Sequence, residues 1–596
     1  MKVILENLRL TWRYALLARG TCLAFVVLSV LGTITDVLSV ALLVPLLSVI
    51  GQADNRFADV AVLRYIAGLF EQLPEDTRLQ WLAGIMFGLI TARALIGLYS
   101  EVFRYTIPVD VERHLRLDAM RNLLDAEVLY SDGLSIEKIA SYCVEFPARI
   151  GIAVRFAVMF LSAAIVTLFY IGGLFLVDPV MAVITFVAVC LFALLYRSIT
   201  QKRVHTISNA VTETRESFNK TFYETVQGTI EIRLGNGRDR VMDEVRGIVG
   251  RLINVQKKNF VLELSSQPFL SLVSGAVICA LIFWIGTQPA GERSVLIAPL
   301  FVFLALLSRL ISPLTIINVC RHHFSLHAVV FDDFEAFMRD LRANRDPDGQ
   351  ATVRALDAPI ELSGVDFGYG PDATALQNIS ATIGPKGFVG LVGPSGSGKS
   401  TLALLLARVY KPQSGDISVR GVDLSDASSE SWTRQIGFAR QGAFVPSRTV
   451  REVISNFDSA PGAQDRVRAA ARQAMADDFI EALPDGYDTV LVTQGHALST
   501  GQKQRLILAR ALYPDPDILI IDEGVSGLDA ITERAILKQI DTLRESKLVL
   551  LITHDLRHVE SADQILVLDK GELVQSGRYD ALAAEQGVFR KMLGLP

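Results

Sequence analysis

The sequence predicts a multi-domain chain in which an all-α transmembrane domain of six helices precedes an α/β domain of the phosphate-loop NTPase class. Long apolar runs are confined to residues 1–320 of the 596-residue chain. A glycine-rich loop at residues 393–401 stands between an apolar run and a helical pattern, which is the context of a phosphate loop. A chain of this length exceeds a single hydrophobic core, so at least two domains are expected.

The bulk composition favours a membrane protein over a nucleic-acid binder. Hydrophobic residues make up 51% of the chain and charged residues only 20%, below the roughly one quarter typical of soluble domains. The net charge of −5 argues against nucleic acid as a partner. The cysteines lack the paired spacing of a metal site or disulfide framework. We interpret all five as packing residues: Cys22, Cys143, Cys190, Cys279 and Cys320.

Residues 1–20 predict an interfacial helix. Charged residues interrupt the apolar core that a signal peptide needs, namely Lys2, Glu6, Arg9, Arg13 and Arg19. Apolar residues recur at helical spacing, which would lay one face on lipid; these are Leu5, Leu8, Trp12 and Leu16. The alternative is that the segment is the cytosolic start of the first span.

Six segments are long and apolar enough, or nearly so, to cross about 30 Å of hydrocarbon. They are residues 22–50, 81–103, 152–176, 180–196, 269–285 and 295–319. The links at 104–149 and 197–267 are long and basic, so the positive-inside bias places them and the N-terminus in the cytosol. Both links have helical patterns, with turns expected near 131–135 and 228–229, which predicts membrane helices that continue beyond the bilayer.

Three charged residues lie deep within the predicted spans: Asp36, Arg93 and Arg309. Charges inside a membrane are costly and usually face a partner or a wet cavity. One hypothesis is a basic cavity for an anionic head group such as phosphate. The other is internal pairing, for example of Asp36 with one of the arginines. The sequence leaves both open.

The glycine-rich loop predicts a nucleotide site. Glycines let the backbone wrap closely around phosphates, so that amide groups and a helix N-terminus point at negative charge. Lys399 would reach the β- and γ-phosphates, and Ser400 would offer its hydroxyl to Mg²⁺. The residues assigned to nucleotide binding here are Gly393, Ser395, Gly396, Gly398, Lys399, Ser400 and Thr401.

A second motif supplies two carboxylates. Residues 518–521 are a run of aliphatic residues, and Asp522 and Glu523 follow directly. Asp522 at a strand end can hold the Mg²⁺ shell, while Glu523 can polarise the attacking water as general base. Downstream of a phosphate loop, this pattern predicts a nucleotide hydrolase that uses Mg²⁺.

Four further motifs resemble those of ATP-binding-cassette (ABC) proteins. Leu498-Ser499-Thr500-Gly501-Gln502 resembles the LSGGQ signature, and Gln441, after a strand pattern at 436–439, resembles the Q-loop glutamine. Ser526-Gly527-Leu528-Asp529 looks like the D-loop, and His554, after the strand pattern at 548–552, looks like the switch histidine. Tyr369 stands where the family has an aromatic residue that stacks on adenine.

The resemblance covers essentially the whole chain, because spans fused ahead of one cassette match the exporter branch of the family. It implies that two cassettes close head to tail over two ATP molecules. Catalytic roles then fall to Glu523, His554 and Gln441, with Ser400, Gln441 and Asp522 at the metal. Ser499, Gly501 and Gln502 of the partner, and Asp529, complete nucleotide binding. Since every group of both half-sites is present, a homodimer is expected.

Departures from the family pattern are few. Thr500 replaces the first glycine of the signature, and Thr493 stands where many exporters have glutamate upstream of it. Gly527 replaces the usual D-loop alanine. A Cβ at position 500 can restrict the backbone near phosphate, and the sequence leaves open whether it slows turnover.

The predicted organisation is an interfacial helix at 1–20, a six-span domain at 21–335, a linker at 336–358 and a cassette at 359–596. The predicted function is ATP-driven export or flipping of an amphipathic substrate by alternating access. The acidic loop at 51–80 and the Glu231-Ile232-Arg233 segment look similar to lipid-linked oligosaccharide flippases, which favours a lipid-linked or glycolipid-type, anionic substrate.

The alternatives are a peptide or hydrophobic-drug exporter and, in another class, an ATP-gated channel or regulatory subunit. Retention of Glu523 and His554 counts against the second. Six spans exclude a soluble DNA-repair ATPase, and the fusion of spans to cassette counts against an importer. The expected location is a bacterial inner (plasma) membrane, with cassette and N-terminus cytosolic and membrane lipid as a further partner.

Overall fold

The structure, a computed structural model, describes residues 2–42, 74, 77–177, 179–287, 289–327, 330–370, 373–491, 498–523 and 530–594. The chain forms two compact units. The membrane unit comprises Met1–Ala126 and Gly133–Arg345, and the cassette unit comprises Glu127–Asp132 and Asp346–Pro596.

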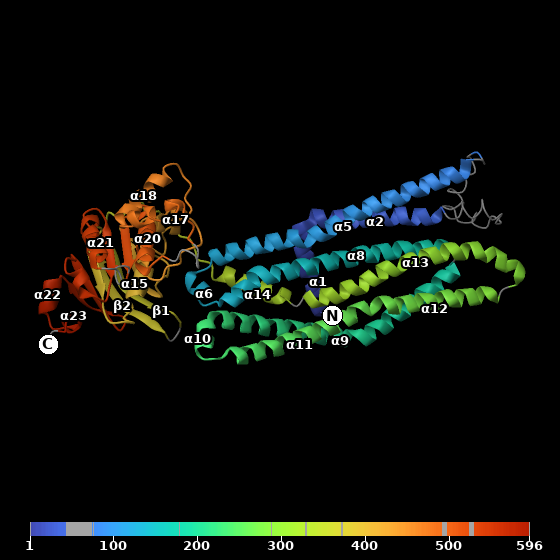
Figure 1. Cartoon of the computed structure of the whole chain (residues 1–596), viewed down its shortest axis with the longest axis horizontal. Helices are drawn as coiled ribbons and strands as arrows, with labels where there is room; N and C mark the ends of the chain where they lie inside the picture. Colours follow the sequence, from blue (N-terminus) through green and yellow to red (C-terminus); the bar gives the residue numbers. More distant parts are fainter. Residues whose placement is uncertain are drawn as a thin grey trace. The chain divides into compact units, whose positions relative to one another are not determined.

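The membrane unit is helical in every element that the structure describes. Figure 1 shows long helices packed side by side, α2 with α5, α8 with α13 and α9 with α11. Their bounds are α1 Lys2–Ala15, η1 Leu16–Ala18, α2 Arg19–Ala41, α5 Arg78–Leu124, α7 Ile136–Ala140, η4 Ser141–Glu145, α8 Phe146–Val177, α9 Pro179–Gln227, α10 Thr229–Leu234, α11 Arg238–Leu264, α12 Ser266–Gly286, α13 Ala290–His327 and α14 Val330–Ala343.

Five helical stretches in the described part of the chain are long and apolar enough to cross a membrane. They are Arg9–Val40, Leu79–Leu124, Ile136–Leu176, Arg238–Gly286 and Phe303–Phe324. The predicted span at 180–196 lies in α9, where several side chains are outside the described residues, so it stays a prediction. The end of the predicted first span, 43–50, and most of the acidic loop at 51–80 also lie outside them.

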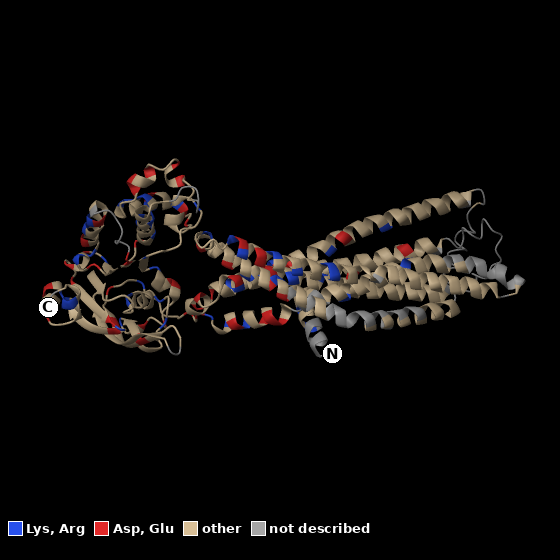
Figure 2. Ribbon diagram, turned by 60° about the horizontal axis from the view of Figure 1, so that its bottom comes forward, with Lys and Arg blue, Asp and Glu red and all other residues tan. Residues whose placement is uncertain are grey.

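The helices are longer than a bilayer requires. α5 has 47 residues and α9 has 49, and at about 1.5 Å per residue each greatly exceeds a hydrocarbon thickness of about 30 Å. Figure 2 shows Lys, Arg, Asp and Glu gathered along one half of the helical bundle and scarce along the other. The breaks expected near 131–135 and 228–229 are present, because helices end at Asp132 and Gln227 and the next ones begin at Ile136 and Thr229.

The N-terminal segment is helical, as predicted. Trp12 and Leu16 are exposed, which leaves apolar side chains on the outer face of the helix. The opposite face is packed, because the Tyr14 hydroxyl donates to Glu335 at 2.5 Å and its ring stacks on Phe331. The location of α1 at a lipid interface stays a prediction.

The first part of the predicted linker at 336–358 is helical. α14 continues to Ala343, so residues 336–343 are helical. Phe334, Phe337, Met338 and Leu341 recur every three or four residues and are buried, and this apolar stripe continues the helix past residue 335.

The cassette unit contains two sheets. The six-stranded sheet has the order β10-β9-β3-β8-β7-β6, and the four-stranded antiparallel sheet has the order β2-β1-β4-β5. The strands are β1 Ile360–Gly368, β2 Thr374–Ile383, β3 Gly387–Val392, β4 Ser414–Val419, β5 Val422–Asp423, β6 Ile436–Arg440, β7 Ile518–Asp522, β8 Leu548–Ile552, β9 Gln564–Asp569 and β10 Glu572–Gly577.

Helices surround the sheets (Figure 1). They are α6 Val128–Asp132, α15 Lys399–Leu406, α16 Ser429–Thr433, α17 Val450–Ser455, α18 Ala463–Gln473, α19 Asp477–Glu481, η5 Gly486–Asp488, α20 Thr500–Leu512, α21 Ala530–Leu543, η6 Leu556–Val559, α22 Tyr579–Ala584 and α23 Val588–Met592. α6 comes from the early part of the chain, yet Leu129 packs against the cassette core and Asp132 accepts from the Tyr410 hydroxyl at 3.4 Å.

The parallel strands bring the sequence motifs to one edge. β8 pairs with both β3 and β7, so that Ile552 lies opposite Leu391 on one side and Asp522 on the other. All residues of β7 and β8 are buried, as expected for strands covered on both faces. The phosphate loop, Glu523 and His554 therefore follow three adjacent strand ends.

Candidate nucleotide site and membrane cavity

The loop between β3 and α15 has a backbone that requires glycine at two positions. Gly393 has φ of 155° and Gly398 has φ of 99°. A Cβ on Gly393 would lie 2.1 Å from the Leu568 carbonyl oxygen, and one on Gly398 would lie 2.7 Å from that of Ala375. The loop is a tight cradle whose shape depends on these glycines, as the sequence predicted for a phosphate loop.

Polar groups from the loop and β7 meet within the cradle. The Lys399 ammonium donates to the carbonyl oxygens of Gly393 and Pro394 at 3.0 and 2.8 Å, and burial lowers its pKa. The Ser400 hydroxyl donates to Asp522 Oδ1 at 3.2 Å. Burial also raises the pKa of Asp522, so a cation beside this carboxyl group would favour its ionised form.

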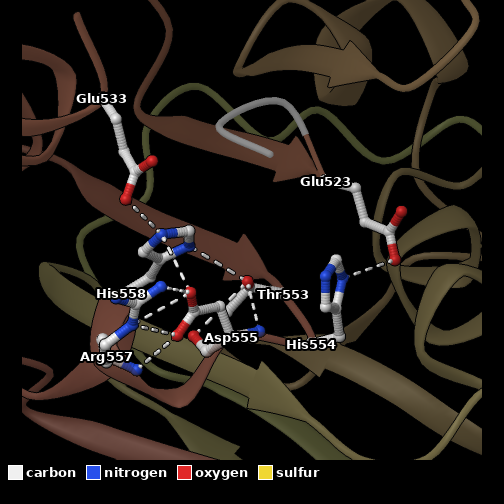
Figure 3. A network of polar contacts seen from close by, with 7 residues as sticks. All are labelled: Glu523, Glu533, Thr553, His554, Asp555, Arg557 and His558. Carbon is white, nitrogen blue, oxygen red and sulfur yellow. Dashed lines mark hydrogen bonds and ion pairs between the residues drawn. The ribbon is translucent and has the colours of Figure 1, made fainter. Parts of the chain in front are cut away.

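Glu523 lies just beyond the end of β7. Its φ is 51°, a left-handed conformation that is uncommon for glutamate and recurs at functional sites, and its amide donates to the Ile552 carbonyl at 3.0 Å. Glu523 Oε1 lies 3.5 Å from Nδ1 of His554, as Figure 3 shows. The two side chains are 30% and 65% exposed, so the carboxylate is accessible to water.

Gln441 and Tyr369 have separate connections to this region. The Gln441 amide donates to the Asp522 carbonyl at 3.0 Å, which places the exposed Gln441 beside the end of β7. The Tyr369 hydroxyl hydrogen-bonds to Thr401 Oγ1 at 2.9 Å, and its half-exposed ring meets Tyr410 edge to face. The structure thus gathers the predicted residues of one half-site.

The signature residues cap a helix. Ser499 is the N-cap of α20: its Oγ accepts from the Gln502 amide at 3.2 Å, and the Gln502 side chain accepts from the Ser499 amide at 2.9 Å. This is a capping box. Within the described residues, no hydrogen bond joins Ser499, Gly501 or Gln502 to the phosphate loop. Asp529, Gly527 and Thr493 lie outside the described residues.

Thr500 is the first residue of α20, so its backbone is helical and needs none of the conformations that only glycine adopts readily. The physical reason for expecting slow turnover is therefore absent from the backbone. We predict that Thr500→Gly changes ATP turnover by less than about twofold, with slightly lower thermal stability because glycine weakens a helix. ATPase assays and melting curves check this, and a large rise in turnover would contradict it.

The three charges predicted within the spans come together in the membrane unit. Asp36, Arg93 and Arg309 line a cavity of about 400 Å³ between α2, α5, α8 and α13. Asp36 is buried; it accepts from the Tyr170 hydroxyl at 2.5 Å and lies 3.4 Å from Arg309 Nη1. Pairing of Asp36 with an arginine is therefore present in the structure.

The cavity also retains positive charge. Arg309 is 54% exposed despite its pairing, and Arg93 has no ion pair among the described residues. The charged side chains Glu101 and Arg104 also line the cavity and pair with each other. Phe25, Leu28, Met159 and Val166 give the wall apolar surface, so it offers cationic and apolar groups together.

Sequence reasoning missed some residues of both sites. Tyr170 is the hydrogen-bond donor that holds Asp36, and its only signal was a hydroxyl within an apolar span. Tyr410 contacts the ring of Tyr369 and had no motif. His558 contacts Thr553. The only signal for it in the sequence was its position four residues after His554.

Comparison with known proteins identifies the family. The model of the ABC transporter transmembrane region matches residues 22–314, and the model named ABC transporter matches residues 376–526. The chain belongs to the ABC transporters. It is an exporter-type half-transporter, with one membrane region ahead of one cassette, and an integral membrane protein that uses ATP to drive transport.

Relatives and a solved structure agree with this assignment. The chain is 27% identical to the ATP-dependent lipid A-core flippase of Methylobacillus flagellatus, over 93% of this chain and 94% of that protein. It is 32% identical to the Beta-(1→2)glucan export ATP-binding/permease protein NdvA of Rhizobium etli, over 54% and 55%. A bacterial Atm1-family ABC exporter with ATP bound has the same fold, with a TM-score of 0.78 at 20% identity over 97% and 98% of the two chains.

Proposed function

We propose that this exporter moves an anionic amphipathic molecule of the lipid-linked or glycolipid type across a bacterial inner membrane. The observation that carries the proposal is the cavity in the membrane unit, where Arg93 and Arg309 stand beside apolar walls. Arginines bind phosphate through charge-assisted hydrogen bonds, and apolar walls suit an acyl or prenyl chain. The names of the relatives, a lipid A-core flippase and a glucan exporter, support a substrate with a saccharide head group.

The same proposal assigns the nucleotide site. Tyr369 stacks on adenine, and the loop amides with Lys399 and Thr401 bind the phosphates. Glu523 accepts a proton from the attacking water. His554 contacts Glu523 and orients the Glu523 carboxylate. Water attack on the γ-phosphorus then breaks the bond to the β–γ bridging oxygen and releases ADP and phosphate.

The residues present fit Mg²⁺. Ser400, Asp522 and Gln441 offer oxygen atoms, which this ion prefers, and the Ser400 hydroxyl at the start of α15 contacts Asp522 at the end of β7. When bound, the ion would offset negative charge on the phosphates. The pairing of Ser400 with Asp522 holds both oxygens at the end of β7.

We further propose that the working unit is a homodimer in which Ser499, Gly501 and Gln502 of one copy, with Asp529, complete the site of the other. The cassette at 359–596 and the interfacial helix at 1–20 lie on the cytosolic side of the six-span domain at 21–335. The place of these residues at the N-terminus of α20 supports this role, because the N-terminus of a helix favours an anion.

The test is substrate stimulation of ATP hydrolysis in lipid nanodiscs. We expect a phosphorylated glycolipid to stimulate hydrolysis, and Arg93→Gln to raise its half-maximal concentration about tenfold, since a charge-assisted hydrogen bond contributes about 1.5–3 kcal/mol. For the same glycolipid without phosphate, Arg93→Gln should change the half-maximal concentration by less than about twofold. The role of Arg309 is tested in the double variant Asp36→Asn, Arg309→Gln. Removing Arg309 alone would leave the buried Asp36 carboxylate without its ion-pair partner.

The matched control is Arg104→Gln, which removes an arginine that lines the same cavity but pairs with Glu101 on its own helix. Its effect on the phosphorylated glycolipid should stay within about twofold. Equal losses with the phosphorylated and unphosphorylated compounds would contradict the anionic site. Stimulation by neutral drugs or peptides alone would favour the hydrophobic-drug or peptide exporter.

A further inference from the structure

A buried histidine lies behind the switch histidine in the cassette unit. His558 is on η6 and its side chain is only 4% exposed. Nε2 lies 2.9 Å from Oε1 of Glu533 on α21, and Nδ1 lies 3.2 Å from the Thr553 hydroxyl. Both ring nitrogens therefore have partners, and the imidazole bridges α21 to the end of β8 (Figure 3).

The contacts of His558 fix the turn that carries His554. Thr553 Oγ1 accepts from the Asp555 amide at 3.0 Å, so one hydroxyl contacts both His558 and the residue after His554. Asp555 in turn accepts from the Arg557 amide at 3.0 Å, and Arg557 holds the pKa of Asp555 down to about 2. The residues on both sides of His554 are thus held by hydrogen bonds.

His554 itself has little to hold it. Its side chain is 65% exposed, and among the described residues its one polar partner is Glu523, at 3.5 Å. A side chain with so few contacts takes its direction from its backbone. That backbone is the turn of Thr553 and Asp555, whose hydrogen bonds lie on both sides of His554.

We infer that His558 and Glu533 form a positioning pair that holds the switch histidine against the catalytic glutamate. The inference rests on the roles of His554 and Glu523 proposed above. His558 touches neither nucleotide nor water in this scheme and acts through Thr553 and His554. Loss of the Glu533 carboxylate removes the acceptor 2.9 Å from Nε2 and leaves, among the described residues, only the Asp555 carboxylate, at 3.8 Å, which frees the imidazole to turn. Loss of Glu533 should therefore slow the chemical step of ATP hydrolysis and leave ATP binding unchanged.

The experiment measures kcat and KM for ATP on the full-length protein in lipid nanodiscs. We expect Glu533→Ala and His558→Phe, which keeps a planar ring but removes both nitrogens, to lower kcat about tenfold with KM within about twofold. Glu533→Gln keeps an oxygen that accepts from Nε2 and should restore most of kcat. The matched control is Asp541→Ala, which breaks the contact of the same helix with Ser561. It should leave kcat within about twofold.

The deciding measurement repeats Glu533→Ala in a His554→Ala background, with radiolabelled ATP to follow the slow residual hydrolysis. If Glu533 acts through His554, the second substitution should change kcat by less than about twofold, because coupled residues are not additive. An equal tenfold loss in both backgrounds, or an unchanged kcat for Glu533→Ala alone, would overturn the inference. Full activity of His554→Ala alone would instead refute the proposed role of His554, and the inference with it.

Discussion

Replacing Glu523 by glutamine is expected to lower ATP turnover about a hundredfold or more, the usual contribution of a general base. The amide has nearly the same shape but accepts no proton at neutral pH. The fold should be unaffected, since the backbone amide of residue 523 still donates to the Ile552 carbonyl. The left-handed backbone conformation has about the same free-energy cost for glutamine as for glutamate. ATP binding should be retained, because the proposed role of the Glu523 side chain is to act on the attacking water and not to bind adenine.

Steady-state hydrolysis in nanodiscs, with ATP binding measured on the same preparation, checks this expectation. Glu572→Gln serves as the control, because Glu572 is an exposed carboxylate on β10 and should change turnover by less than about twofold. Full turnover by Glu523→Gln would remove the proposed base. Loss of ATP binding together with turnover would show that Glu523 has a structural role instead.

Gly398→Ala is expected to raise the dissociation constant for ATP by about tenfold or more, equivalent to about 1.4 kcal/mol. The new methyl group would lie 2.6 Å from Leu376 Cδ2 and 2.7 Å from the Ala375 carbonyl oxygen. The loop must therefore shift, and its amides would no longer point at the phosphates. The φ of 99° adds a conformational cost of about 1–3 kcal/mol to the folded state.

Gly421→Ala separates these two effects. Gly421 also has a positive φ, of 74°, but a Cβ there meets nothing within 4 Å. We expect it to lower the free energy of unfolding by about 1 kcal/mol while leaving the ATP dissociation constant unchanged. If the two alanine variants weaken ATP binding equally, global destabilisation and not the cradle explains the loss.

The fold was predictable where local pattern and tertiary packing agree. The apolar run before the glycine-rich loop and the strand patterns at 436–439 and 548–552 correspond to β3, β6 and β8, because buried parallel strands are continuous apolar runs. Asp346 and Pro347 indicate a break in the chain, but the helix before them, α14, extends to Ala343 because its apolar stripe packs against α5 and α8. Sequence spacing shows such a stripe but not its partner.

The nucleotide site was predictable because its motifs are short and local. The partners in the membrane cavity were not, because Asp36, Tyr170 and Arg309 come from three helices far apart in sequence. A charge within a span signals that some partner exists, yet which arginine pairs depends on how the helices pack. The same limit applies to His558, whose partner Glu533 stands on a different helix.

The small helix α6 has a consequence for how the chain is made. Leu129 packs against the cassette core and Asp132 pairs with Tyr410, yet this segment leaves the ribosome long before any cassette residue. Because domains fold as they emerge, the membrane half must complete its own helices with this segment still unpartnered. The cassette, once synthesised, then packs against a segment that was made before it.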